Sequence, residues 1–217
     1  MNTNKLSWFT SACLIVVLGN TALAQDQKDH AAHALAGLTA INARDYKLAV
    51  KELTLAFRGI DGQNPDNRPI QAKYAHDLGK TYLEWFKSDD NITQAKKREC
   101  LMQCLAFMRQ AAVLDRTYIA PRQTLYDIYW QMAYGQLAQR RPGIDWSGFI
   151  EHANALLELD PKNAVAWYRL GVAWSNHAEQ TVNLQAARKG LDNFRKAIAL
   201  DSDNIGYWGA WLTLLKW

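Results

Sequence analysis

The sequence lacks the local signatures of the common enzyme classes. Its five histidines show no H-E-x-x-H spacing and no helical pair one turn apart with a carboxylate between them. It also has no Gly-rich loop of the kind that cradles phosphates and no nucleophile elbow. We therefore predict that the protein is not an enzyme, and we expect neither catalytic residues nor a cofactor.

An excess of charge of one sign is also lacking. The chain has 25 basic and 21 acidic residues, a formal net charge of +4. The basic clusters KKR at 96–98 and RR at 140–141 are not interleaved with aromatic residues, as a nucleic-acid groove would require. We expect these clusters on solvated helix faces, and no nucleic-acid partner.

Long hydrophobic runs are confined to the N-terminus. Lys5 precedes the run FTSACLIVVLG, and Ala22 and Ala24 occupy the small-residue positions that a signal peptidase reads. The run is about ten residues, short of the roughly 20 that span a bilayer. We predict a signal peptide at 1–24, a mature chain at 25–217 with net charge +3, and a periplasmic or secreted location. An uncleaved anchor is the alternative.

Cysteine is scarce, and the mature chain keeps only Cys100 and Cys104. Four residues apart on one helix face, their Cβ atoms would be about 5–6 Å apart, whereas a disulfide needs about 3.5–4.5 Å. They are either small buried hydrophobes or a redox or metal pair, and their redox state stays open. Asp29, His30 and His33 form a weak candidate metal set, with a solvated helix start as the alternative.

The remaining sequence is a succession of apolar helix patterns separated by short turns. Consecutive patterns of this kind predict antiparallel helix hairpins. The first hairpin covers 33–57, with its turn at 42–45. The others pair 71–86 with 95–115, 121–137 with 146–161, and 160–174 with 185–201, and a partial fifth covers 206–217.

These hairpins resemble the tetratricopeptide repeat (TPR) family. Its signature is Trp, two spacers, Leu-Gly, two spacers and Tyr on the first helix, then Ala, three spacers and an aromatic residue on the second, with a closing Pro. The positions that match are Trp167, Leu170, Gly171, Trp174, Gly190, Phe194 and Ala197 in the fourth unit, Leu78, Gly79, Tyr82, Cys104, Met108 and Ala111 in the second, Gly37, Tyr46, Ala49, Leu53 and Ala56 in the first, and Leu125, Tyr129 and Pro161 in the third. The resemblance implies an all-α, right-handed superhelical solenoid.

The chain departs from the family pattern at several positions. Ser202 stands where the fourth unit should close with Pro, and Tyr126 stands where the third unit should have Gly. The distance from Trp167 to Trp208 is 41 residues rather than 34, and longer helices or wider turns would absorb the difference. Gly and Ala in this signature allow helices to approach, so Trp167 and Trp174 are interpreted as packing residues rather than a ligand cage.

The last predicted helix is apolar, although a stack of repeats normally closes with a polar outer face. Tyr207, Trp208, Trp211, Leu212, Leu214, Leu215 and Trp217 all fall in it. Such a helix needs a covering partner. Either the chain is a fragment of a longer array, or a second subunit or another protein covers this end.

The resemblance implies a function as a protein-binding scaffold, because first helices line the concave side of such arrays. The side chains expected there are Lys73, His76, Lys80, Gln123, Asp127, Trp130, Gln131, Tyr168, Val172 and Asn176. Trp130 and Tyr168 are the predicted anchors, with packing against a neighbouring helix as the alternative. Some family members grip a C-terminal carboxylate. Arg169 could contribute to such a clamp, but Val165 and Thr124 occupy the companion positions, so no clamp is predicted.

We therefore expect a non-catalytic scaffold of the bacterial envelope that binds a partner peptide or helix, in the assembly of an envelope complex. Self-association through the last helix is one alternative. A metal or redox protein that uses the His and Cys residues is the other.

Overall fold

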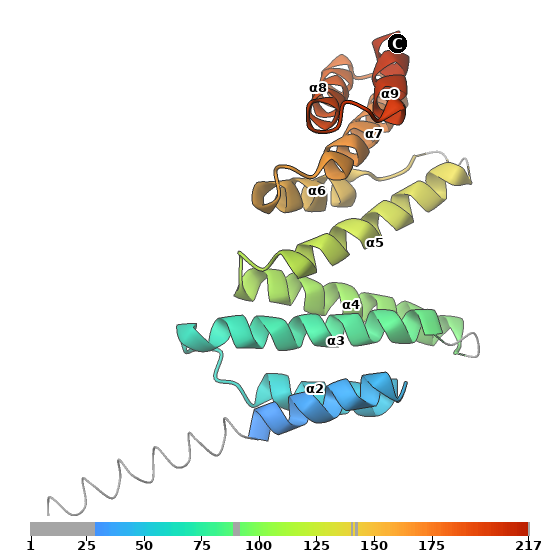
Figure 1. The fold of residues 1–217 in the computed structure, drawn as a ribbon. Helices are drawn as coiled ribbons and strands as arrows, with labels where there is room; N and C mark the ends of the chain where they lie inside the picture. The colour runs from blue at the N-terminus through green and yellow to red at the C-terminus, as the bar shows by residue number, and fades with distance from the viewer. Residues whose placement is uncertain (1–28, 89–91, 140, 142, 217) are drawn as a thin grey trace, which may run out of the picture. The chain divides into compact units, whose positions relative to one another are not determined.

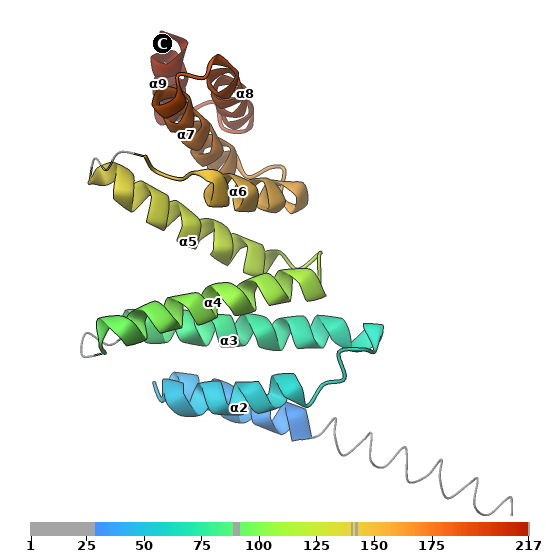
Figure 2. The same cartoon turned by 180° about the vertical axis from the view of Figure 1, so that it is seen from behind.

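The structure is a computed structural model that describes residues 29–88, 92–139, 141 and 143–216. Within these residues every regular element is helical. The chain divides into two compact units, Met1–Asp115 and Arg116–Trp217, and each is described by itself (Figures 1 and 2). The predicted signal peptide lies outside the described residues.

The first unit opens with a hairpin made of a helix at 29–42 and α2 (Tyr46–Arg58). Asp45 ends the turn and caps α2, since its carboxylate accepts a hydrogen bond from the backbone N–H of Leu48 at 3.0 Å. A Cβ atom at Gly37 would lie 2.6 Å from Cγ of Leu53. Glycine therefore allows the two helices to cross closely, and the predicted first hairpin is confirmed.

The second hairpin joins α3 (Arg68–Ser88), which follows a short 3-10 turn η1 (Pro65–Asn67), to α4 (Gln94–Leu114). The two long helices run side by side (Figure 1). A Cβ atom at Gly79 would lie 3.2 Å from the carbonyl oxygen of Cys104 and 3.0 Å from the side chain of Met108. The matched Gly therefore marks the helix crossing, as the TPR pattern predicts.

The second unit contains α5 (Ile119–Ala138), α6 (Ser147–Leu159), α7 (Ala164–Thr181), α8 (Leu184–Leu200) and α9 (Ile205–Leu215). In the α5–α6 hairpin, Tyr126 takes the place of the signature glycine on α5 and is buried against Phe149, with ring centroids 5.3 Å apart. Gly148 of α6 provides the close approach instead, because a Cβ atom there would lie 2.7 Å from the Tyr129 ring.

The α7–α8 hairpin follows the signature most closely. Phe194 of α8 fills the space that Gly171 leaves, at 2.6 Å from an added Cβ atom. Trp167 and Trp174 are half-buried against the core, with the ammonium groups of Lys196 and Lys189 lying 4.0 and 4.3 Å from their respective ring centroids. The interpretation of both tryptophans as packing residues is confirmed.

A 41-residue repeat relates α7 to α9. The indole N–H of Trp167 donates to the carbonyl of Pro161, and that of Trp208 donates to the carbonyl of Ser202, both at 2.9 Å. Asn163 and Asn204 cap the two helices, and their side chains accept hydrogen bonds from the backbone N–H groups of Ala166 and Gly206 respectively. Ser202 thus takes the structural place of the closing Pro. Since α7 continues for 18 residues to Thr181, a longer first helix absorbs most of the extra length.

Candidate functional site

A groove of about 440 Å³ opens in the second unit between α5, α7 and the start of α9. These are the first helices of successive hairpins, the elements that the TPR resemblance places on a binding side. The lining residues are Trp130, Tyr134, Val165, Tyr168, Arg169, Val172, Asn204, Gly206 and Tyr207. We call this the aromatic groove.

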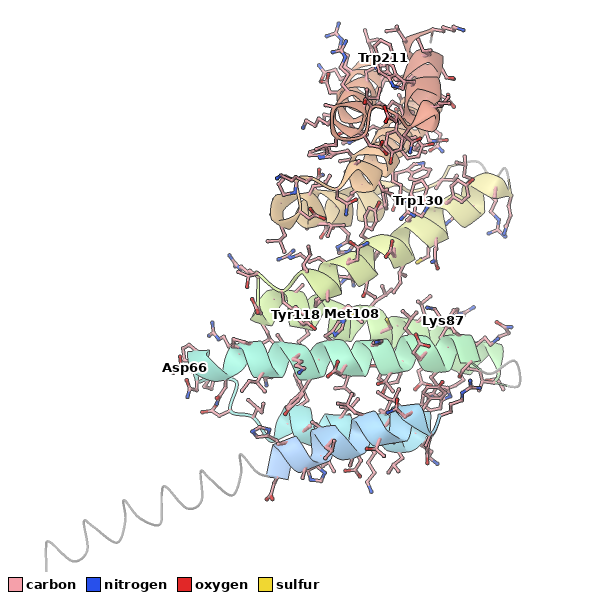
Figure 3. The ribbon with its side chains drawn as sticks, in the orientation of Figure 1. Asp66, Lys87, Met108, Tyr118, Trp130 and Trp211 are labelled. Carbon is pink, nitrogen blue, oxygen red and sulfur yellow. The ribbon has the colours of Figure 1, made fainter. Side chains whose placement is uncertain are left out.

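Two aromatic pairs form the walls of the aromatic groove. Trp130 and Tyr134, one turn apart on α5, stack with ring centroids 5.2 Å apart. Tyr168 of α7 and Tyr207 of α9 stack at 4.8 Å. Trp130 projects from α5 toward α7 (Figure 3). Such stacked rings offer large contact areas at a low cost in conformational entropy, which suits a surface for apolar ligand side chains.

Arg169 brings a positive charge to the aromatic groove. Its Cζ atom lies 5.0 Å from the Trp130 ring centroid and 5.3 Å from that of Tyr126. Its Nη1 donates to a carboxylate oxygen of Asp127 at 3.1 Å, and Gln123 donates to the other oxygen, also at 3.1 Å. The guanidinium group is thereby held in one orientation. Arg169, the residue considered for a carboxylate clamp, is thus already paired with Asp127.

The tyrosines beside Arg169 remain neutral at physiological pH. Burial raises the pKa of Tyr126 to about 12, and the nearby Arg169 opposes the shift. Burial also raises the pKa of Tyr207, with Asp201 adding to the effect. Of the nine lining residues, therefore, Arg169 alone carries a formal charge, and the remaining surface is aromatic, aliphatic or amide.

The structure brings together three predicted groove residues: Trp130, Tyr168 and Val172 line one cavity. Gln123 and Asp127 lie beside it and orient Arg169. Gln131 is exposed on α5, and the amide of Asn176 donates to the carbonyl of Val172 at 2.8 Å.

The three groove residues predicted on α3 belong to the first unit. Lys73 and Lys80 are exposed, and His76 is mostly buried, with Nδ1 3.5 Å from the Asp77 carboxylate. Lys80 lines a separate cavity of about 330 Å³ together with Leu38 and Thr81. That Lys73, His76 and Lys80 contribute to partner binding stays a prediction.

Sequence reasoning missed Tyr134, Val165, Arg169, Asn204, Gly206 and Tyr207 as lining residues. Two of them had a usable signal. Tyr134 lies one turn after Trp130 and Val165 lies one turn before Arg169, so each shares a face with a residue already considered. Tyr207 had been counted only as part of the apolar last helix, and its stacking on Tyr168 depends on where α9 folds back.

The cysteine candidates are buried in the core, and the histidine candidates contact other side chains. Cys100 and Cys104 are free thiols that are fully buried on α4. Burial raises the pKa of both thiols, that of Cys104 to about 12, so thiolate chemistry is disfavoured at neutral pH. His30 lies 3.1 Å from the Tyr74 hydroxyl, and His33 lies 2.7 Å from the Glu52 carboxylate.

Two further searches cover only the described part of the chain. No group of three or more His, Cys, Asp or Glu side chains is placed there to hold a metal ion. No described helix combines the length and the apolar character needed to cross a membrane.

Comparison with known proteins rests on structure. No protein-family model and no curated protein matches the sequence. The fold is similar to the solved structures of the MamA protein (TM-score 0.53, 13% identity, 88% of this chain and 82% of that one) and of MamA AMB-1 (TM-score 0.54, 16% identity, the same shares).

A third solved structure, described as "YrrB: a TPR protein with an unusual peptide-binding site", matches with a TM-score of 0.46 and 19% identity over 95% of this chain and 87% of that one. At this TM-score it carries no weight here. The hairpin architecture, the matched signature positions and the MamA likeness agree with one another: the chain has an all-α, TPR-like fold, as its sequence predicted.

Proposed function

We propose that this protein is a non-catalytic scaffold that binds a segment of a partner protein in the aromatic groove. The observation that carries the proposal is the convergence of two stacked aromatic pairs and Arg169 from three first helices on one open cavity. Large rings near the centre of an interface often supply much of the binding energy. The ligand that fits is a peptide or helix with large apolar side chains.

The ligand also has a polar requirement. Arg169 presents a delocalised cation within reach of the cavity, while Asp127 neutralises much of its charge. A carbonyl or carboxylate oxygen of the ligand would find a hydrogen-bond donor there without leaving a buried charge unpaired. We expect the arginine to contribute orientation and specificity, and the rings to contribute most of the affinity.

The groove is tested by co-purification with a variant that keeps the core intact. Trp130 and Tyr168 are half-buried, so their removal would also weaken the fold. Tyr134 and Val165 are 51% and 47% exposed. The variant Tyr134→Ala, Val165→Asp should therefore fold normally, and an acidic residue in the first turn of α7 favours the helix.

The matched control is Met132→Ala, Val182→Asp, which alters two exposed apolar residues that do not line the groove. The proposal expects a protein retained by the original and by the control to be lost from the groove variant. Retention of the same proteins by all three baits, with circular dichroism showing equal helix content, would reject the aromatic groove as the binding site.

We further propose that the protein acts in the bacterial envelope, in the assembly of an envelope complex. The support is the pattern of Lys5, the apolar run and Ala22-Leu23-Ala24. Cell fractionation and the intact mass of the purified protein test this. Export predicts a chain that starts at Gln25 in the periplasmic or secreted fraction, whereas a full-length chain in the membrane fraction would favour the uncleaved anchor.

A further inference from the structure

One face of α9 is apolar and exposed. Ile205, Trp208, Leu212 and Leu215 are 84, 42, 48 and 53% exposed, although each is a large hydrophobic residue. Their intervals of three, four and three residues place them on one side of the helix. We call them the α9 stripe. The opposite side of α9, with Tyr207 and Leu214, is buried against α7 and α8. The side chain of Trp211, also on α9, lies toward α8 (Figure 3).

The 41-residue repeat shows which kind of structural element can pack on this stripe. The equivalent residues of α7 are Ala164, Trp167, Gly171 and Trp174, and they pack against α8. In α7 the face is covered by the second helix of the hairpin. In α9 the same face is uncovered within the described residues. The α9 stripe is therefore a helix-packing surface in the register of the repeat.

The stripe differs from its α7 equivalent at three of its four positions, and the change from Gly171 to Leu212 has the largest effect on what can cover it. Gly171 admits the Phe194 ring, whereas Leu212 occupies that position in α9. A helix like α8, with an aromatic residue at this position, would collide with Leu212. A helix that interdigitates with large aliphatic side chains at seam spacing fits this surface, and α9 itself has such a face.

The charges at the two ends of α9 select the direction of such a pair. Asp201 and Asp203 precede the helix, and Lys216 follows it, all exposed. In a parallel pair like charges would meet. In an antiparallel pair Lys216 lies beside Asp203 of the partner subunit, and the helix dipoles also oppose favourably. We propose that two copies of this chain associate through their α9 stripes, antiparallel about a two-fold axis.

The pairing has a defined register. A two-fold axis at the middle of the stripe sets Ile205 against Leu215 of the partner subunit and Trp208 against Leu212 of the partner subunit. Gly209 lies at the edge of this seam, near the axis, and a Cβ atom built there meets nothing within 4 Å. The backbones can therefore approach on that side. Self-complementary contacts of this kind are those that a two-fold interface requires.

The interface is small. An 11-residue helix with four stripe residues per copy covers less than the roughly 1,200 Å² of the smallest stable interfaces, so the dimer is weak and depends on concentration. Asn204, Gly206 and Tyr207, which alternate with stripe residues, line the aromatic groove. Pairing therefore carries two aromatic grooves in one assembly, and a partner with two binding segments would gain avidity.

Light scattering across a concentration series tests the pairing. The protein is expressed from the full 217-residue sequence and purified as the cell produces it, with or without the predicted signal peptide. The expected result is a mass that rises from one to two copies. Leu212→Glu should weaken the dimer at least about tenfold, since it buries a charge in the seam. Val182→Glu is the control, because Val182 is 81% exposed outside the stripe.

Charge reversal tests the direction of pairing. Lys216→Asp should weaken the dimer roughly twofold to tenfold, and adding Asp203→Lys should restore it, because the two positions face each other only in the antiparallel pair. Gly209→Cys should form a disulfide-linked dimer on mild oxidation, whereas Glu151→Cys on α6 should not.

Three outcomes would overturn the inference. The first is a single copy at every concentration. The second is association that persists in Leu212→Glu. The third is a charge-reversed pair that fails to recover while both single variants fold. Loss of the dimer leaves binding by the isolated groove intact, so this experiment and the co-purification test separate claims.

Discussion

The helices α7 and α9 begin alike and end in different surroundings. Each is capped by an asparagine, at Asn163 and Asn204, and each sends an indole N–H back to a carbonyl six residues earlier. Along α7, however, Gly171 receives Phe194 of α8, while the corresponding Leu212 of α9 is 48% exposed. Local sequence thus sets how a first helix starts, and the next helix sets whether its face becomes core.

The comparison separates two sources of stability in a repeat. Caps and the indole hydrogen bond are short-range, so they should contribute equally in α7 and α9. Burial between hairpin helices is long-range and should contribute only where a covering helix exists. Four pairs of substitutions divide these terms. The first three are measured by urea unfolding followed by tryptophan fluorescence and the fourth by thermal melts, all at protein concentrations low enough to keep the chain monomeric.

The largest difference is expected between Phe194→Ala and Leu212→Ala. Phe194 is 1% exposed and fills the Gly171 site, so its removal should lower the free energy of unfolding by about 3–5 kcal/mol. Leu212 faces outward in the monomer, and its removal should cost less than about 1 kcal/mol. Comparable losses at both sites would mean that the α9 stripe is covered even in the monomer.

Alanine at two helix glycines should act with opposite signs. An alanine at Gly171 places Cβ 2.6 Å from the buried Phe194 ring, which should destabilise by about 1–2 kcal/mol after the gain in helix propensity. At Gly209 the space is open, so alanine should stabilise by about 0.5–1 kcal/mol. A destabilising Gly209→Ala would show that another element approaches α9 there.

The two capping asparagines should be equal. Asn163 accepts from the backbone N–H of Ala166 at 3.0 Å, and Asn204 accepts from that of Gly206 at 3.1 Å. Alanine at either position should lower the free energy of unfolding by about 1 kcal/mol. A neutral Asn204→Ala would show that the two caps do not contribute equally to the free energy of unfolding.

The smallest effects are expected at the paired tryptophans. Phenylalanine at Trp208 removes one partly exposed hydrogen bond, at about 0.5 kcal/mol, whereas phenylalanine at Trp167 also weakens the contact with Lys196, at about 1 kcal/mol in total. Circular dichroism melts of the two variants and of the wild type provide the comparison. The two indole hydrogen bonds have the same length in the wild type, so they should contribute equally. An excess loss at Trp208 would contradict this order.

Much of the fold could be predicted from sequence because each hairpin carries its own pattern. The predicted spans 33–57, 71–86 with 95–115, and 121–137 with 146–161 each overlap an observed hairpin, with 95–115 and 146–161 exceeding their helices by one or two residues at an end. Gly37, Gly79 and Gly171 each mark a real helix crossing, since only a residue without Cβ fits at such distances. The TPR signature was weakest at Tyr126, because in this hairpin the glycine at the close approach is Gly148 on the second helix.

The candidate site was only partly predictable. Trp130, Tyr168 and Val172 were found because first-helix positions facing away from the hairpin core follow from helical periodicity. Arg169 was considered for a carboxylate clamp, yet its contact with Asp127 joins residues 42 positions apart and has no local signature. Tyr207 entered the groove because α9 folds back onto α7, which no pattern within α9 indicates.

The helices, their caps, their pairing into hairpins and the all-α, TPR-like fold follow from local patterns in the chain, because these depend on interactions within a few residues and on apolar spacing along one helix. Contacts between hairpins set which aromatic rings became walls of a groove, which cation was held at its edge and which apolar face stayed open. Those outcomes depend on which surfaces meet after the hairpins stack, and contacts between distant residues leave no periodic trace in the chain.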